Sequence, residues 1–330
     1  MIAKRGLLTS SLILLFFACA GQKTLEDSID HLLENLNGVV LISQKGKPVY
    51  AKAGGYSDFY TKEKTKVSDL FVIGSISKQI TAVLILRSVE KGAISLKDTI
   101  GQYLPSLMQD WKDQITIHHL LTHTHGISTL EQPLEFSPGS QFNYSQIGYQ
   151  LLADILEKAN GHSFTQQSIA LFKQMGLKNT FHPEALKNSE WPKAFIESSE
   201  GKIALELKSY KNYVPAGGFI SNARDLAKWN ELLYHDKLVK AETLQLMSTR
   251  YATRQHPIFG EIAYGYGLLF KSGEAGKKIG ALGYTPGFAS SCYYYPQKGI
   301  SVVVLQNLDR NVENFNDLFA IHMAVMQLFN

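Results

Sequence analysis

The segment "FVIGSISKQITAVLILRSVEKG", residues 71–92, combines a short apolar run with a lysine placed inside an apolar helix pattern. The run ends at Gly74, Ser75 follows, and Lys78 lies where the helix is predicted to begin. Apolar side chains occupy nearly every side of this helix, so we expect it to be central and buried. Lysine is almost never fully buried without a partner, so its position at the start of this helix has to be explained.

Serine and lysine three residues apart lie on the same face of a helix. A lysine held partly out of water loses some of its preference for the charged form, and its neutral amine can then take the serine proton. The alternative is that Ser75 caps the helix while Lys78 extends its ammonium group to solvent. The S-x-x-K spacing occurs at Ser75/Lys78, Ser88/Lys91 and Ser199/Lys202. Only the first pair follows a strand-like run and opens a helix.

The composition is that of an ordinary globular protein. The chain has 330 residues, of which 45% are hydrophobic, and a formal net charge of +4. This length permits one large domain or two smaller ones. No long basic run with interleaved aromatic residues is present, so we expect no nucleic-acid partner.

The first twenty residues have the pattern of an export signal. Lys4 and Arg5 precede the short apolar stretch "GLLTSSLILLFFACA". We predict a signal peptide over residues 1–20 and a single mature domain over residues 21–330. Two endings stay open, namely cleavage after Ala20 or lipidation of Cys19, and a retained membrane anchor is a third alternative. We therefore expect a bacterial protein of the periplasm, or a lipoprotein tethered to the membrane through Cys19.

The second cysteine, Cys292, has no partner once Cys19 is lipidated or removed. We expect no disulfide framework, and we interpret Cys292 as a small buried hydrophobic residue.

Strand patterns occur at both ends of the chain, and helical patterns fill its middle. Residues 38–55 are predicted to form two strands joined at "QKGK", and strands return in residues 263–307. Residues 24–36 and 314–329 have helical spacing. The pattern predicts an α+β fold in which terminal helices pack on an antiparallel sheet built from N- and C-terminal strands. A helical lobe over roughly residues 75–230 would be inserted, and the cleft between the lobes would hold a small-molecule site.

Two helix ends within this lobe are predicted from single residues. Ser221 is expected to cap the helix that follows it, and Gly161 to end the helix of residues 144–161.

Several segments in order resemble the superfamily of serine β-lactamases and penicillin-binding proteins, closest to its class C β-lactamase-like branch. These segments are "FVIGSISKQITAVLIL", "ISLKDTIGQYLPSL", "ITIHHLLTHTHGIS", "FSPGSQFNYSQIGYQLLADILEKANG", "AGGFISNARDLAKW" and "GYTPGFASS". The resemblance spans most of the mature chain and implies a β-lactamase/transpeptidase-like fold. It also implies that Ser75 is the acylated nucleophile, that Lys78 exchanges its proton, and that Tyr144 activates the attacking water or alcohol.

Two positions depart from the family pattern. Gln146 replaces the asparagine of the Y-x-N motif, which keeps an amide but changes its reach by one methylene. The K-T-G or H-x-G motif falls on residues 281–283, where Ala281 replaces the lysine or histidine. Lys278 lies three residues earlier, on the opposite face of the strand. Without that lysine or histidine of the motif, a substrate carboxylate loses a charged or polar binding partner. A neutral ester or amide substrate depends on this partner least.

The resemblance also implies an oxyanion hole made by backbone N–H groups. These belong to Ser75 and to Tyr284, the residue after Gly283, and backbone donors do not depend on side-chain identity.

Four histidines in "HHLLTHTH" allow a competing interpretation. His119 and His123 are four apart and on one helix would suit a metal, although no acidic residue accompanies them or their neighbours His118 and His125. The resemblance implies instead a structural histidine at position 123. We predict no metal and no cofactor.

The sequence predicts a monomeric exported serine hydrolase that acts through an acyl-enzyme on an ester, amide or peptide-type substrate. An α/β-hydrolase is disfavoured because no G-x-S-x-G motif occurs. One alternative is a catalytically weak or inactive protein of the same fold that binds cell-wall peptides or a partner. The other is β-lactamase or D-alanyl-D-alanine carboxypeptidase activity.

Overall fold

The structure is a computed structural model that describes residues 26–206, 213–271, 278–310 and 314–329. The predicted signal peptide, with Cys19, lies outside the described residues. Among the described residues, no helix is both long and apolar enough to cross a bilayer.

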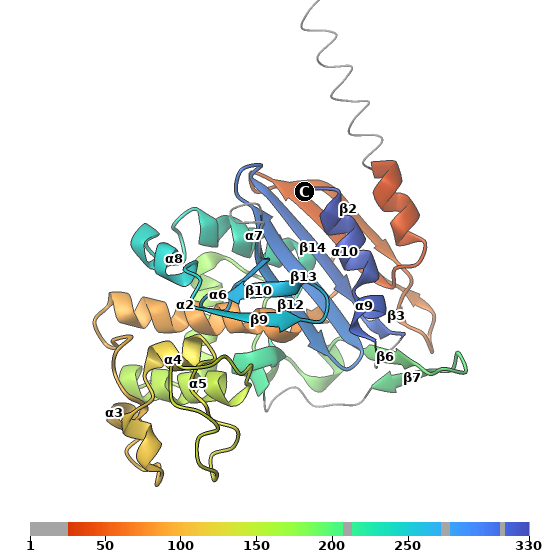
Figure 1. The fold of residues 1–330 in the computed structure, drawn as a ribbon. Helices are drawn as coiled ribbons and strands as arrows, with labels where there is room; N and C mark the ends of the chain where they lie inside the picture. Colours follow the sequence, from red (N-terminus) through yellow and green to blue (C-terminus); the bar gives the residue numbers. More distant parts are fainter. Residues whose placement is uncertain (1–25, 207–212, 272–277, 311–313, 330) are drawn as a thin grey trace, which may run out of the picture.

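An eight-stranded antiparallel sheet forms the centre of the molecule, with spatial order β2-β1-β14-β13-β12-β11-β10-β9 (Figure 1). The expected α+β class is confirmed, because strands from both ends of the chain meet in this sheet. Its strands are β1 (Gly38–Gln44), β2 (Lys47–Gly54), β9 (Ala252–His256), β10 (Gly260–Tyr264), β11 (Leu269–Lys271), β12 (Ile279–Thr285), β13 (Phe288–Tyr295) and β14 (Ile300–Gln306). The β1–β2 turn at Lys45-Gly46 has positive φ at both residues, as two-residue hairpins favour.

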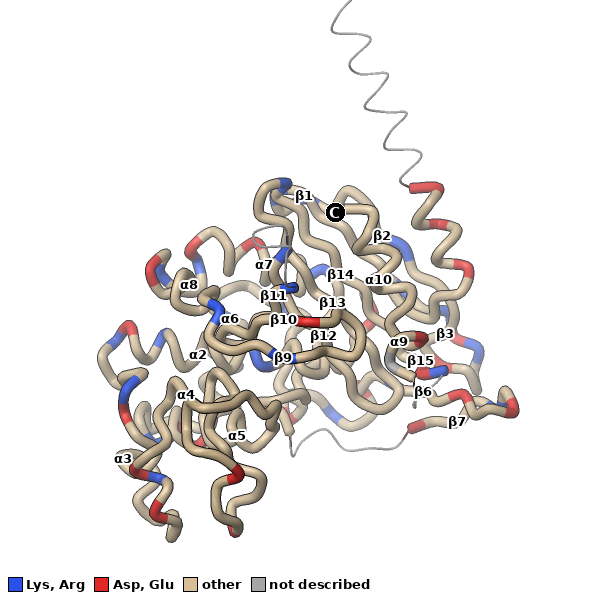
Figure 2. The backbone as a smooth tube through the Cα atoms, viewed as in Figure 1, with Lys and Arg blue, Asp and Glu red and all other residues tan. Residues whose placement is uncertain are grey.

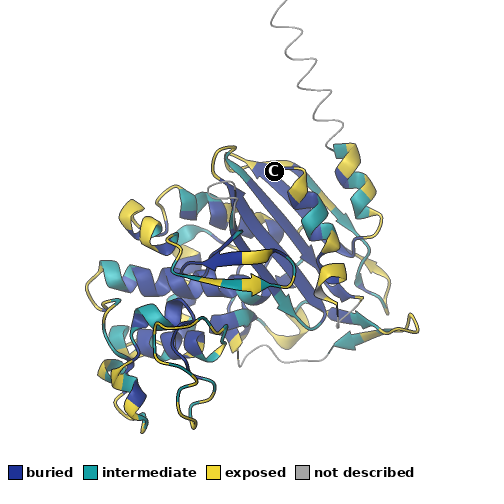
Figure 3. Cartoon of the chain, in the orientation of Figure 1, coloured by how far each residue is buried: buried dark blue, intermediate teal, exposed yellow. Residues whose placement is uncertain are grey.

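Both faces of the sheet are covered, so its central strands are apolar on both sides. Along β1, Val39 and Leu41 join one core, while Val40 and Ile42 join the other. Helix α7 (Ala223–Tyr234) packs on the first face against β1, β13 and β14. The helical residues 26–33 and helices α9 (Phe315–Leu318) and α10 (Ala320–Gln327) cover the second. Figure 3 shows the sheet buried between these layers.

The remaining elements form the helical part of the molecule and three small sheets. The helices are α2 (Ser77–Glu90), α3 (Ile100–Tyr103), α4 (Ile117–Leu121), α5 (Ile147–Asn160), α6 (Phe164–Met175) and α8 (Ala241–Met247), with short turns η1 (Gly74–Ile76), η2 (Asp110–Asp113), η3 (Pro183–Ala185), η4 (Asn188–Glu190) and η6 (Val214–Gly218). The small sheets pair β3 (Tyr56–Asp58) with β4 (Glu63–Lys64), β5 (Phe71–Val72) with β8 (Ile220–Ser221), and β6 (Ala194–Glu197) with β7 (Ile203–Glu206) and β15 (Leu308–Asp309).

Helix α2 is central, as expected, and most of its residues are buried, Lys78 included. Ser75 lies in the turn η1 before the helix and does not cap it, because the N-cap is Ile76 and no side chain caps the helix. The capping alternative for Ser75 is therefore wrong. Ser75 is also the one residue between 71 and 80 that is not buried.

Three predicted details require correction. The N-cap of α7 is Asn222, whose side chain accepts from the Asp225 N–H, while Ser221 belongs to β8. Strands begin at Ala252, before the predicted start at 263, because the hairpin β9–β10 precedes it. The C-terminal helix is broken at Phe319. The predicted end of α5 at Gly161, a residue with φ of 70°, is confirmed.

Turn η1 and strand β12 approach so closely that two glycines face each other. A Cβ atom added to Gly74 would lie 2.5 Å from the Tyr284 backbone nitrogen, and Gly74 has a φ of +53°. A Cβ atom added to Gly283 would lie 2.0 Å from the Ile73 carbonyl oxygen. The Ser290 hydroxyl donates to that same carbonyl over 2.7 Å. These contacts bring the backbone of Ser75 beside that of Tyr284.

We predict that Gly283→Ala lowers the free energy of unfolding by about 1–3 kcal/mol, because its methyl group overlaps backbone atoms. Gly217→Ala is the matched control, since its added Cβ would meet nothing closer than 3.8 Å. Urea unfolding of both variants measures the difference. Equal stability of the two variants would contradict the close approach of η1 and β12.

Candidate active site

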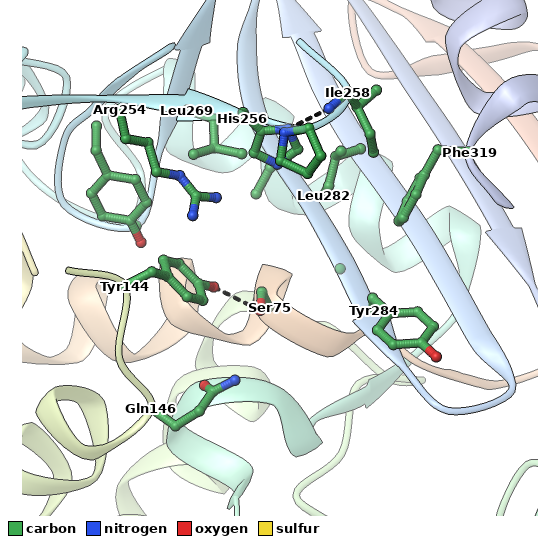
Figure 4. A pocket seen from close by; sticks show the side chains of 15 residues that line it. Ser75, Tyr144, Gln146, Arg254, His256, Ile258, Leu269, Leu282, Tyr284 and Phe319 are labelled. Carbon is green, nitrogen blue, oxygen red and sulfur yellow. Dashed lines mark hydrogen bonds between the residues drawn. The ribbon is translucent and has the colours of Figure 1, made fainter. Parts of the chain in front are cut away.

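A pocket of about 270 Å³ opens above Ser75, between the helical part of the molecule and the sheet (Figure 4). It is lined by Ser75, Tyr144, Gln146, Arg254, His256, Pro257, Ile258, Tyr264, Gly267, Leu269, Ala281, Leu282, Gly283, Tyr284 and Phe319. Every site residue predicted from the sequence lines this pocket except Lys78, which lies beneath its floor. The lining contains no carboxylate.

The three predicted catalytic side chains converge on the Ser75 oxygen. The Tyr144 hydroxyl donates to Ser75 Oγ over 2.8 Å, and Lys78 Nζ lies 3.3 Å from the same oxygen. Figure 4 shows the Tyr144 hydroxyl directed at Ser75 from the segment before α5. A hydroxyl that accepts from a phenol can still donate its own proton to an amine. The three side chains form a hydrogen-bonded chain in which each group carries an exchangeable proton.

Lys78 is 1% exposed and has no carboxylate partner among the described residues. Its Nζ donates to Gln146 Oε1 and to the Ala216 carbonyl, both over 2.7 Å. Burial is the main cause that lowers the pKa of Lys78. A neutral amine has two N–H donors and one lone pair. The two short bonds use both donors, and the lone pair is left for the Ser75 proton.

The backbone around Lys78 is fixed by hydrogen bonds between α2 and η6. Thr81 Oγ1 donates to the Pro215 carbonyl over 2.6 Å, and the Phe219 N–H donates to Ser77 Oγ over 3.2 Å. These bonds hold the Ala216 carbonyl against Lys78. Gln146 is exposed at the rim of the pocket, yet its amide oxygen still reaches the amine.

His123 supports Tyr144 from behind. Its ring lies 4.4 Å from the Tyr144 ring, and its Nδ1 accepts the Ser145 N–H over 3.2 Å. That contact places the ring proton on Nε2, which donates to the Tyr264 hydroxyl over 3.1 Å. Burial lowers the pKa of His123 well below 6.5, so the ring is neutral.

The four histidines do not share one site. Helix α4 ends at Leu121 and His123 has a φ of 58°, so the helical spacing assumed for His119 and His123 is wrong. His118 contacts the Tyr266 hydroxyl, and His119 accepts the Thr116 N–H. His125 accepts the Ile127 N–H and lies against Gly148, where a Cβ would be 2.7 Å from its Nε2. Among the described residues, no group of three or more potential ligands could hold a metal ion.

Ala281 and Gly283 line the pocket from β12, and Tyr284 follows them beside Gly74. The Tyr284 hydroxyl donates to Asp309 Oδ2 over 2.9 Å, which turns its side chain away from Ser75 (Figure 4). Cys292 pairs with Ala281 across the sheet and is fully buried, as expected.

Two lining elements were not predicted. Strand β9 contributes Arg254 and His256, and its segment "ATRQH" gives no apolar alternation that could mark it as a strand. Phe319 enters the pocket because α9 and α10 meet there, whereas helical periodicity predicts one continuous helix.

The depressed pKa of Lys78 gives a prediction for stability. The folded state binds the Lys78 proton less tightly than the unfolded chain, where the pKa is near 10.5. The native protein therefore gains stability from Lys78 as pH rises from the depressed pKa toward 10.5. Lys78→Met cannot titrate, so its stability relative to the unmodified protein is expected to fall from pH 7 to pH 10.

Urea unfolding at several pH values in this range measures that difference. Lys91→Met, which removes an exposed lysine at the end of α2, is the matched control. A difference for Lys78→Met that does not change with pH would contradict a buried amine that resists protonation.

Comparisons with known proteins agree with this geometry. A family model described as Beta-lactamase matches residues 25–325. Penicillin-binding protein 4* of Bacillus subtilis (strain 168) is 26% identical over 319 residues, covering 84% of this chain and 69% of that protein. The octameric penicillin-binding protein homologue from Pyrococcus abyssi superposes with a TM-score of 0.78 at 26% identity, covering 93% of this chain and 77% of that chain.

The D-amino acid amidase from Ochrobactrum anthropi SV3, complexed with L-phenylalanine amide, has a TM-score of 0.81. It covers 92% of this chain and 98% of its own, and at 20% identity the likeness shows the fold alone. The chain belongs to the Beta-lactamase family, within the superfamily of serine β-lactamases and penicillin-binding proteins, whose characterised members are serine hydrolases.

Proposed function

We propose that this protein is an exported serine hydrolase that cleaves a neutral ester or amide through an acyl-enzyme on Ser75. The observation that carries the proposal is the convergence of the Tyr144 hydroxyl and the buried Lys78 amine on Ser75 Oγ, at 2.8 and 3.3 Å. Export is supported by the charged and apolar pattern of residues 4–20.

In the proposed acylation, Ser75 Oγ attacks the substrate carbonyl carbon and its proton moves to the neutral Lys78 amine. The carbonyl oxygen becomes an oxyanion, and the backbone N–H groups of Ser75 and Tyr284 stabilise it. The tetrahedral intermediate then breaks its bond to the leaving group. Tyr144 gives that group its proton, and the Lys78 ammonium reprotonates the phenol.

Deacylation follows the same groups in reverse. Water enters where the leaving group was, and its oxygen attacks the carbonyl carbon of the acyl-enzyme ester. The proton of the water passes to Tyr144 as the phenol passes its own proton to Lys78. The Ser75 oxygen departs with the returned proton. Acid and base roles exchange between the two steps, as general acid–base catalysis requires.

The lining of the pocket supports an apolar group on the substrate. Pro257, Ile258, Leu269, Leu282 and Phe319 form one wall, while the hydroxyl of Ser75 lies at its base. Ala281 supplies no cation from β12, so residues 281–283 are not expected to bind a substrate carboxylate through a charged side chain. The replacement at Ala281 favours ester or amide hydrolysis over β-lactamase or carboxypeptidase activity.

We predict that Ser75→Ala abolishes labelling by a fluorophosphonate probe and formation of an acyl adduct seen by intact mass spectrometry. Lys78→Met and Tyr144→Phe should each lower kcat/KM for phenyl acetate by at least about 100-fold, because each removes one proton-transfer group.

The chain provides matched controls for all three variants. Ser199→Ala and Lys91→Met alter the other S-x-x-K pairs, and Tyr213→Phe alters an exposed tyrosine. Each control should keep full activity. A folded parent protein that is neither labelled nor acylated would overturn the proposal and favour the non-catalytic binding protein.

The apolar wall gives a separate prediction about acyl groups. Ile258→Ala removes methyl and methylene groups from the wall, and each buried methylene contributes about 0.8 kcal/mol. Loss of the contact of about one methylene should therefore lower the kcat/KM ratio of p-nitrophenyl hexanoate to p-nitrophenyl acetate about fourfold. Ile169→Ala, on the exposed side of α6, is the control. An unchanged ratio in Ile258→Ala would show that the acyl group binds elsewhere.

A further inference from the structure

The site lacks a cation on β12 but has one on β9. Ala281 occupies the position at which the resemblance implies lysine or histidine, and Arg254 lines the same pocket from β9, the edge strand on that side of the sheet. Figure 4 shows the guanidinium group of Arg254 extending into the pocket above Tyr144. Figure 2 shows β9 and β10 crossing the front of the sheet. No element predicted from the sequence contains this arginine.

Among the described residues, Arg254 contacts aromatic rings rather than a carboxylate. Its Nε atom is buried and forms no hydrogen bond with the described residues. No carboxylate in the described part of the chain pairs with its guanidinium group, which lies 5.5 Å from the Phe142 ring and 5.0 Å from the Tyr144 ring. Half-buried arginines normally bind carboxylates, whereas this guanidinium group faces two aromatic rings.

Tyr144 lies between two basic side chains. Lys78 Nζ is 4.7 Å from the centroid of its ring, and the Arg254 guanidinium carbon is 5.0 Å from it. Since the pocket lining holds no carboxylate, the positive charge of Arg254 acts on both members of the proton-transfer pair without local compensation. A fixed positive charge here opposes protonation of Lys78.

We propose that Arg254 is a positioning residue that supplies, from β9, the positive charge that β12 lacks at Ala281, and that this charge sets the pH range in which Lys78 and Tyr144 activate Ser75. The proposal rests on the proposed function. It assigns Arg254 no contact with the reacting atoms.

Burial is the largest cause of the lowered pKa of Lys78, and Arg254 adds to it as the charged group among those packed around this pair. His123 lies after α4, Tyr149 on α5, Tyr264 on β10 and His256 on β9. Burial lowers the pKa of His256 to about 4 and that of His123 well below 6.5, so both are neutral at pH 7. Burial raises the pKa of Tyr149 and Tyr264, so both remain phenols.

The sign of the effect follows from these charges. Arg254 is among the causes that lower the pKa of Lys78. Without the arginine, the pKa of Lys78 rises, and the amine becomes neutral only at higher pH. The rising limb of kcat/KM against pH should then move to higher pH.

The test measures kcat/KM for phenyl acetate, a substrate without charge, between pH 5 and 10. Arg254→Gln should move the rising limb upward by about half a pH unit or more. Arg254→Lys keeps the charge and should stay near the unmodified profile. Arg254→Gln combined with Ala281→Lys restores a cation to the pocket from β12. The rising limb of this double variant should return toward the pH of the unmodified protein. Fluorophosphonate labelling at high pH confirms that each variant is folded.

An unchanged rising limb in a folded, active Arg254→Gln variant would overturn the proposal. A loss of kcat/KM confined to substrates that carry a carboxylate, with no shift of the limb, would also overturn it, because Arg254 would then bind substrate. Failure of the proposed function is distinct from both results, since the unmodified protein itself would then neither hydrolyse the ester nor take the label.

Discussion

The burial of one amine without an opposing charge is the constraint on which the rest of the site depends. Lys78 can lie inside the molecule because α2 is enclosed by η6, α5 and α6, and because two short hydrogen bonds satisfy its donors. The ammonium form would lose its hydration and find no carboxylate in its surroundings, which favours the neutral form. A neutral amine next to a serine hydroxyl is a base. The apolar helix that looks unsuited to a lysine is what keeps this amine out of water.

The second constraint is the contact between η1 and β12. Gly74 and Gly283 let two backbones approach where any side chain would collide with main-chain atoms. The same contact brings the backbone next to Ser75 close to that of Tyr284, which is the arrangement that the proposed oxyanion hole requires. The replacements at Ala281 and Gln146 leave this backbone arrangement intact. The amide of Gln146 still binds Lys78. Departures from a family motif can therefore change substrate recognition while the proton-transfer groups and the backbone donors keep their geometry.

Much of the fold and of the candidate site could be predicted from the sequence. The physical reasons for this also explain why some elements were missed. The strands of residues 38–44 and 300–306 are apolar on both faces because both faces are covered, and α2 is apolar all round because it is central. The order of the motif segments identified Ser75, Lys78 and Tyr144. Strand β9 was missed because "ATRQH" is polar at the edge of the sheet, and Arg254 was missed with it. Phe319 has helical spacing, and the break that directs it into the pocket depends on packing against the sheet.

The central claim is that Lys78 is a neutral amine at the pH at which the protein acts. The most direct measurement is an NMR titration of protein labelled with ¹³C at the lysine Cε, with the Lys78 signal assigned by its absence from Lys78→Met. The account predicts that this signal titrates well below the 10.5 of an ordinary lysine, apart from the signals of the exposed lysines. A Lys78 signal that titrates together with the exposed lysines would contradict the account.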